Sequence, residues 1–413
     1  MIELYLFSYV SLLVVYYILV SRVNLFQIKL SSIFLLAHLL VFFITPLLFK
    51  EYYFFENVPF FLISLISLIS IMAAFIAPIP SIKNIYFTPR KGVLNLLFFI
   101  FMILVLYRIA TGLEQVGSDK VMESLKNEMT GRGVVSVLIS LLIIAGMFQF
   151  SYLFHHRMKL FVISYSLFFI SVVLVSAHRT PVVIAMVSPL LVYVILKYRG
   201  IINPLLISIS AGVIFTVMYA MNFFRQGMTG QLLNNEFNLY TASLNSLSGL
   251  NTSKYLYDLI IGNYPIEYFS NSYYWILAYI PRRLYPEKPV VSFNVRTTES
   301  FYEYIVGDFK GADIRTFTLP GEGYIQFSYI GVILLTFLAV YMSRFLISIY
   351  LRFEYSEFLI VGFLFSVLIN FRSAFDSFLH SVVYSIILLT FLIPILFNMK
   401  KKGYTSDSSF LTK

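Results

Sequence analysis

Long apolar segments alternate with short polar segments along most of the chain. A helix needs about 20 apolar residues to cross the hydrocarbon core of a bilayer. Eleven segments come close to that length, and we predict that each forms a membrane-spanning helix. The pattern therefore predicts an all-α polytopic membrane protein. The predicted spans cover residues 4–20, 29–49, 58–78, 92–112, 134–154, 159–178, 181–197, 203–222, 323–349, 356–371 and 377–398.

One polar interval is much longer than the others. It separates the eighth and ninth predicted spans, and Pro and Gly recur in it at GNYPIEYF, YIPRRLYPEKP and TLPGEG. Long ordered loops tend to carry function, and we expect stretches such as SNSYYWILAYIP to form interfacial helices. The predicted organisation is eight spans (1–222), a large loop (223–322), three spans (323–398) and a disordered tail (399–413).

The basic residues of the short loops predict the orientation of the chain. Lys and Arg concentrate in every second loop and in the tail, and such loops face the cytoplasm. This places the N-terminus and the large loop outside and the C-terminus in the cytoplasm. Residues 1–20 lack a basic leading region and a cleavage site, so we interpret them as a span and not as a signal peptide. The cytoplasmic set is Arg22, Lys29, Lys83, Arg90, Lys91, Arg157, Lys159, Lys197, Arg199, Arg344, Arg352, Lys400, Lys401 and Lys402.

Composition supports the membrane class and excludes several kinds of chemistry. Hydrophobic residues make up 59% of the chain and charged residues 12%, whereas soluble domains are about 25% charged. The net charge of +10 belongs to the loops, so nucleic acid is not an expected partner. The absence of cysteine excludes disulfides and thiolate chemistry. Motifs for a metal or a nucleotide are also missing from the sequence, and we predict no cofactor.

Several cations lie on the predicted outer side, where the charge rule disfavours them. One interpretation is that they anchor the protein at the lipid interface. The other is that they converge on an anion, because the guanidinium fork binds phosphate at two points and stays charged in a dry site. A lipid-linked pyrophosphate is such an anion. The candidates are Arg179, Arg225, Arg282, Arg283, Lys288, Arg315 and Arg372.

Three residues near these cations are candidates for acid–base chemistry. Glu322 is the first choice as a general base, or it orients Arg315. A carboxylate beside arginines is a weak base unless burial offsets their charge. His178, next to Arg179, is either a proton acceptor or a polar turn residue.

Asp376 belongs to RSAFDSFLH, where Arg372, Asp376 and His380 recur at every fourth residue and would share one helix face. Either Asp376 holds Arg372 toward a substrate, or the two form a structural ion pair. Another polar pair, His155 and His156 in LFHHRMK, is expected on the inner side in contact with lipid headgroups.

Three motifs together resemble the O-antigen polymerase family. They are the turn AHRTP, the loop segment IPRRLYPEKP and the segment RTFTLPGEGYIQFSYIG. Members of this family show proline-arginine, then lysine-proline, then a threonine, glycine-glutamate, aromatic and glycine pattern, in which Tyr324 is the aromatic residue. The resemblance covers roughly residues 170–385. The first 160 residues resemble only polytopic membrane proteins in general.

The resemblance implies a large polytopic glycosyltransferase of the GT-C-like type in the bacterial inner membrane. Such an enzyme polymerises undecaprenyl-pyrophosphate-linked repeat units into O-antigen at the outer face, without metal or cofactor. Its expected partners are lipid-linked glycans, membrane lipids and a chain-length regulator protein. The cations listed above would then stabilise the leaving pyrophosphate. Two alternatives share the architecture: an O-antigen ligase, and a flippase of lipid-linked oligosaccharides.

Overall fold

In the computed structural model the chain comprises two compact units, each described by itself below. The first unit comprises residues 1–80, 245–346 and 366–385, and the second comprises 81–244, 347–365 and 386–413. The residues that the structure describes are 2–20, 25–44, 54, 56–80, 85–115, 133–175, 179–197, 250–267, 277, 285, 287, 297, 318–373 and 375–401.

The described residues are mainly helical, which confirms the predicted class of secondary structure. Every predicted span that falls within them coincides with a helix, whereas residues 203–222 lie outside them. Within the described ranges, four segments are long and apolar enough to cross a membrane: Leu25–Phe43, Val58–Ile76, Lys91–Ala110 and Leu319–Tyr350. The helices are α1 (Ile2–Val20), α2 (Leu25–Leu39) with the π-helical η1 (Leu40–Ile44), α4 (Val58–Ile76), α5 (Lys91–Gln115), α7 (Gly133–His156), α8 (Met158–Val175), α9 (Arg179–Leu191) with the π-helical η3 (Val192–Lys197), α12 (Leu250–Ile261), α15 (Leu319–Tyr350), α16 (Glu357–Ser373) and α17 (Phe375–Leu396).

In the first unit, a buried histidine connects three helices. His38 of α2 is fully buried, and its Nδ1 lies 3.2 Å from the Tyr9 hydroxyl of α1. Its Nε2 lies 2.6 Å from the Ser67 hydroxyl and 3.0 Å from the Ser64 carbonyl oxygen of α4. A buried polar group is costly unless it is hydrogen-bonded. These contacts therefore fix how α1, α2 and α4 pack against one another.

A short helix within the predicted outer loop packs against the same unit. Leu256 of α12 is fully buried in a cluster with Phe54, Phe60 and Val332. Tyr257 meets Phe54 edge-to-face, with ring centroids 4.8 Å apart. The sequence analysis did not predict this helix. Its apolar residues are buried against side chains from other parts of the unit, and this packing forms only when the chain folds.

A buried arginine caps the end of α4. This helix ends where Ala77 precedes Pro78, because a residue before proline is disfavoured in the α conformation. Arg344 of α15 is buried, and its Nη1 donates to the carbonyl oxygens of Ala74 and, at 3.1 Å, Ala77. Its guanidinium also lies 5.0 Å from the centre of the Phe75 ring. The predicted end of this span at residue 349 agrees with the end of α15 at Tyr350. The contacts of Arg344 with α4 were not predicted from the sequence.

In the second unit, α5, α7 and α8 pack together around an aromatic core. Phe150 of α7 is fully buried and meets Tyr165 of α8 edge-to-face, with ring centroids 5.0 Å apart. Phe101 of α5 and Phe358 of α16 belong to the same cluster. The many phenylalanines of the sequence thus fill the interior of this unit as well as its surface.

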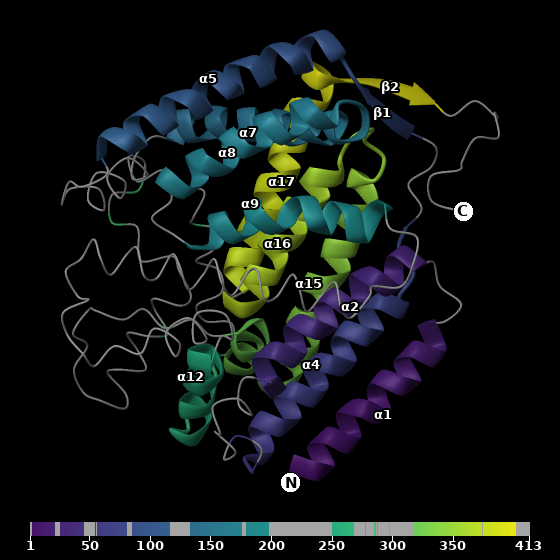
Figure 1. Ribbon diagram of the computed structural model, residues 1–413. Helices are drawn as coiled ribbons and strands as arrows, with labels where there is room; N and C mark the ends of the chain where they lie inside the picture. The colour runs from purple at the N-terminus through teal and green to yellow at the C-terminus, as the bar shows by residue number, and fades with distance from the viewer. Residues whose placement is uncertain are drawn as a thin grey trace. The chain divides into compact units, whose positions relative to one another are not determined.

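Two strands of the second unit pair in antiparallel fashion, β1 (Ile85–Pro89) with β2 (Phe397–Lys401) (Figure 1). Ile85 is opposite Lys401, and Pro89 is opposite Phe397. Phe87 stacks on Phe353, with ring centroids 4.5 Å apart. The prediction that KKKGYTSDSSFLTK is disordered was therefore wrong for its first two residues, Lys400 and Lys401. Each strand is too short to be recognised from its sequence alone. The extended conformation is stabilised by the hydrogen bonds between the two strands.

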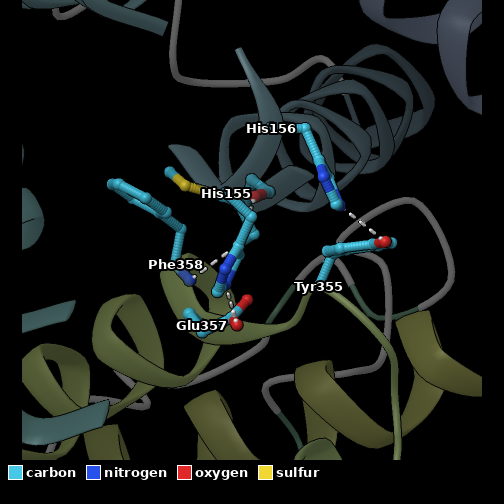
Figure 2. A network of polar contacts seen from close by, with 7 residues as sticks. His155, His156, Tyr355, Glu357 and Phe358 are labelled. Carbon is cyan, nitrogen blue, oxygen red and sulfur yellow. Dashed lines mark hydrogen bonds and ion pairs between the residues drawn. The ribbon is translucent and has the colours of Figure 1, made fainter. Parts of the chain in front are cut away.

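A polar network joins the end of α7 to the start of α16 (Figure 2). The His155 Nε2–H donates to Glu357 Oε1 at 2.5 Å, and both side chains are about one-fifth exposed. His156 Nε2 lies 3.0 Å from the Tyr355 hydroxyl. Burial, aided by the Glu354 carboxylate, raises the pKa of Tyr355 to about 12, so this phenol stays protonated. Both histidines bind protein groups, which the sequence did not predict. Their expected contact with lipid headgroups stays a prediction.

We predict measurable coupling between His155 and Glu357. Hydrogen bonds to charged groups contribute about 1.5–3 kcal/mol, so a double-mutant cycle of His155→Ala and Glu357→Ala should give a coupling energy in that range. Thermal or denaturant unfolding of the purified protein measures it. The pair His156→Ala with Glu357→Ala is the control and should be closer to additive. Full additivity of the first cycle would contradict the structural role of this pair.

Candidate functional site

The segment that carries the glycine-glutamate motif forms the start of α15. Thr318 precedes this helix and caps it, because its Oγ1 accepts the Gly321 N–H at 2.9 Å and its carbonyl accepts the Glu322 N–H at 2.8 Å. Pro320 lies in the first turn, where proline is tolerated. The helix begins at Leu319, four residues before the predicted start of the span, so Glu322 belongs to a helix and not to the loop.

A kink separates this first part of α15 from the long apolar part. Phe327 and Ser328 have non-helical dihedral angles, and φ of Ser328 is +55°. A non-glycine residue with positive φ is uncommon and carries strain, and such residues cluster at functional sites. Residues 319–326 therefore form a short helical segment of their own. The part after Ser328 is about 33 Å long at 1.5 Å per residue, enough to cross a bilayer.

Two glycines allow the backbones on either side of the kink to approach closely. A Cβ placed on Gly331 would overlap the carbonyl oxygen of Gly323. A Cβ placed on Gly323 would lie 2.5 Å from the carbonyl oxygen of Gly331 and 2.8 Å from the Val332 nitrogen. Only glycine fits at both positions. The glycines of the motif thus shape the fold of the segment.

We predict that Gly331→Ala destabilises the protein by about 1–3 kcal/mol, the usual cost of overpacking. The added methyl group meets backbone, which cannot move aside like the end of a side chain. Thermal unfolding in detergent measures the loss. Gly362→Ala in α16 is the matched control, because a Cβ there has nothing within 4 Å and alanine is the better helix former. Equal stability of both variants would contradict the close approach.

The carboxylate of Glu322 is buried and interacts with the start of another helix. Its side chain is 4% exposed, and Oε2 accepts the backbone N–H of Phe375, the first residue of α17. The first N–H groups of a helix have no partner within the helix, and the helix dipole favours a negative charge there. Glu322 therefore caps α17, whose second residue is Asp376. The sequence analysis did not anticipate this contact.

A second carboxylate, which belongs to the long loop between the eighth and ninth predicted spans, contacts the same segment. Glu267 of GNYPIEYF accepts the Tyr264 hydroxyl at 3.0 Å and the Gln326 Nε2–H at 3.3 Å. Its backbone N–H donates to the Ile325 carbonyl at 2.8 Å. The proline and glycine around it were the only sequence signal. The short segment 319–326 thus carries one carboxylate, Glu322, which contacts the start of α17. It binds a second carboxylate, Glu267, through Gln326.

The remaining predicted site residues fall into two groups. Tyr324 is half-buried on the short segment, 5.4 Å from the Tyr329 ring, and Arg179 is the first residue of α9 in the second unit. Arg372 is the penultimate residue of α16. Outside the described residues lie His178, Arg225, Arg282, Arg283, Lys288 and Arg315.

The expectation that Arg372, Asp376 and His380 share one helix face was wrong for Arg372. The segment is divided between α16, which ends at Ser373, and α17, which begins at Phe375. Asp376 and His380 remain one turn apart on α17. The division gives α17 a helix N-terminus of its own, and this is the N-terminus that Glu322 caps.

Chemically, the arrangement offers a fixed carboxylate at the end of a kinked helix. One oxygen of Glu322 is held by the α17 backbone, which fixes the carboxylate group in position. A carboxylate held in this way can accept a proton from a hydroxyl that reaches it. Among the described residues, no group of histidine, aspartate and glutamate side chains has a geometry that would hold a metal ion. Arg179 belongs to the second unit.

Comparison with known proteins gives no match: no family model, no curated protein and no solved structure is significantly similar to the chain.

Proposed function

We propose that the chain is a membrane glycosyltransferase that polymerises oligosaccharide repeat units carried on a lipid pyrophosphate. In this proposal the protein lies in the bacterial inner membrane. Its N-terminus and large loop are outside, and its tail is in the cytoplasm. The undecaprenyl-linked glycans are both donor and acceptor, and the product is an O-antigen-type surface polysaccharide. The eleven-span, GT-C-like architecture is part of the same proposal.

The observation that carries the proposal is the buried position of Glu322 at the kinked start of α15. The motif that resembles the polymerase family contains this glutamate, and the carboxylate is held by the first residue of α17. A residue with only a surface role would be exposed. The strained Ser328 and the glycine contact beside it add support, since strain of this kind is costly and tends to mark functional segments.

The proposed reaction transfers the growing chain to the incoming repeat unit. A sugar hydroxyl of the acceptor attacks the anomeric carbon of the donor and forms the new C–O bond. Its proton passes to Glu322, and the bond between the anomeric carbon and the pyrophosphate oxygen breaks. The electron pair stays on the pyrophosphate, whose charge the arginines would stabilise. Preorganised cations aimed at developing charge are usually the largest catalytic contribution.

Reconstitution tests the proposal against its alternatives. The purified chain is placed in proteoliposomes with a lipid-linked repeat unit, and the products are separated on a gel. A ladder of polymer is the expected result. Transfer of the glycan to a lipid A core acceptor would instead identify a ligase. Movement of the lipid across the bilayer without a new bond would identify a flippase and would overturn the enzymatic proposal.

A further inference from the structure

The second unit contains an open pocket of about 550 Å³ where β1 meets α5. The start of α5 and the paired strands line it. The polar and charged lining residues include Arg90, Lys91, Glu354 and Asn398, and Gly92 lies beside them. This pocket is distinct from the candidate site described above, which belongs to the first unit.

The charges of the pocket favour an anion. Arg90 and Lys91 contribute two cations, against the single carboxylate of Glu354. Among the described residues, Arg90 makes one side-chain hydrogen bond, from Nε to Asn398 Oδ1 at 3.0 Å, which orients its guanidinium. The remaining guanidinium N–H groups can bind phosphate. Since α5 begins at Lys91, its positive dipole end adds to this field.

An apolar surface continues from the pocket along α5. Leu96, Phe99, Ile103 and Leu106 are each more than half exposed and follow Gly92 at intervals of three or four residues. They therefore lie on the same side of the helix as Gly92. Residues Lys91–Ala110 are among the segments apolar enough to cross a membrane, and only 17% of them are buried. This face of α5 has the composition of a surface that contacts acyl chains.

We propose that the pocket binds the headgroup of an anionic phospholipid whose acyl chains lie along α5. The headgroup phosphate contacts Arg90 and Lys91, and the chains cover Leu96, Phe99 and Ile103. A basic pocket at the end of a membrane helix is the arrangement that recognises anionic headgroups. Glu354 opposes the anion and limits the affinity. The site serves neither donor nor acceptor glycan, and the proposal is independent of the polymerase reaction.

The test measures lipid binding to the purified full chain by native mass spectrometry. The probes are phosphatidylglycerol and phosphatidylcholine with the same acyl chains. Phosphatidylglycerol should bind more tightly. Each cation near a membrane surface contributes about 1 kcal/mol, which corresponds to about fivefold in affinity. Arg90→Gln and Lys91→Gln should therefore each weaken phosphatidylglycerol binding about fivefold and leave phosphatidylcholine binding nearly unchanged.

Two substitutions separate binding from folding. Gly92→Asp places a negative charge in the pocket, where a Cβ has nothing within 4 Å, and an acidic residue in the first turn favours the helix. It should weaken phosphatidylglycerol binding while α5 stays folded, and Gly92→Ala is its matched control. Glu354→Gln should strengthen binding several-fold.

Three outcomes would overturn the proposal. One is equal affinity of the wild type for both lipids. Another is unchanged phosphatidylglycerol binding in Gly92→Asp and the Arg90 and Lys91 variants. The third is inorganic phosphate displacing the lipid at micromolar concentration, which would identify a site for a free anion and not for a lipid.

Discussion

Glu322→Gln should abolish most polymer formation while leaving the protein folded. The amide is nearly the same size as the carboxylate, and its oxygen still accepts the Phe375 N–H, so the cap on α17 persists. What it loses is the ability to take a proton from the acceptor hydroxyl. General-base catalysis contributes about 100-fold or more. The initial rate of polymer formation by the purified protein should therefore fall by at least that factor, at unchanged unfolding temperature.

Glu322→Ala separates the two roles of this side chain. It removes both the base and the cap, and loss of a capping group costs about 1 kcal/mol. The alanine variant should therefore be less stable than the glutamine variant and equally inactive. A normal rate for Glu322→Gln would leave the carboxylate with a structural role only. If Glu267→Gln were inactive while Glu322→Gln kept its activity, the base would be Glu267. Its carboxylate accepts a hydrogen bond from Gln326 of the same short segment.

Arg344→Met should destabilise the first unit by about 3 kcal/mol, because two carbonyl oxygens at the end of α4 lose a charged donor. Because Arg344 is buried, water cannot easily replace that donor, and an unsatisfied buried backbone group is costly. The methionine fills a similar volume and keeps contact with Phe75. Thermal unfolding in detergent or nanodiscs measures the change.

Two further substitutions at the same helix end test this reasoning. Tyr341 also reaches past the end of α4, where its hydroxyl donates to the Pro78 carbonyl at 3.1 Å in an exposed setting. Tyr341→Phe should cost much less than Arg344→Met, because water can satisfy an exposed carbonyl. Arg344→Lys keeps the positive charge but loses the planar guanidinium group. Its loss of stability should lie between those of Tyr341→Phe and Arg344→Met. If the Arg344→Met protein were as stable as the wild type, the free-energy cost of burying the guanidinium charge would equal the stabilisation from its hydrogen bonds to α4.

Local sequence was sufficient to locate the helices but not the contacts between them. The apolar runs predicted α1, α4 and α5 to within about three residues at most ends, because hydropathy sums over neighbouring positions. The same reasoning missed α12, whose pattern is short, and the pairing of β1 with β2 across more than 300 positions. It also treated residues 372–380 as one helical face, because nothing in the local composition separates α16, which ends at Ser373, from α17, which begins at Phe375.

In the candidate site, too, the sequence located the residues but not the contacts between them. From sequence, Glu322 was a charged residue at the mouth of a span, with Arg315 as its nearest partner. The folded chain holds its carboxylate against Phe375, 53 positions away, and places Glu267 beside Gln326. No spacing rule could predict either contact, since each joins residues more than 50 positions apart in the sequence.

By itself, the sequence determined that the chain is helical and suited to a membrane, and which loops carry positive charge. These properties follow from the transfer free energies of individual side chains, which add along the chain. The tertiary structure alone decided which polar groups meet: Glu322 with the start of α17, Arg344 with the end of α4, and His155 with Glu357. A buried polar group must find its partner in three dimensions, and that requirement depends on packing and not on the order of residues.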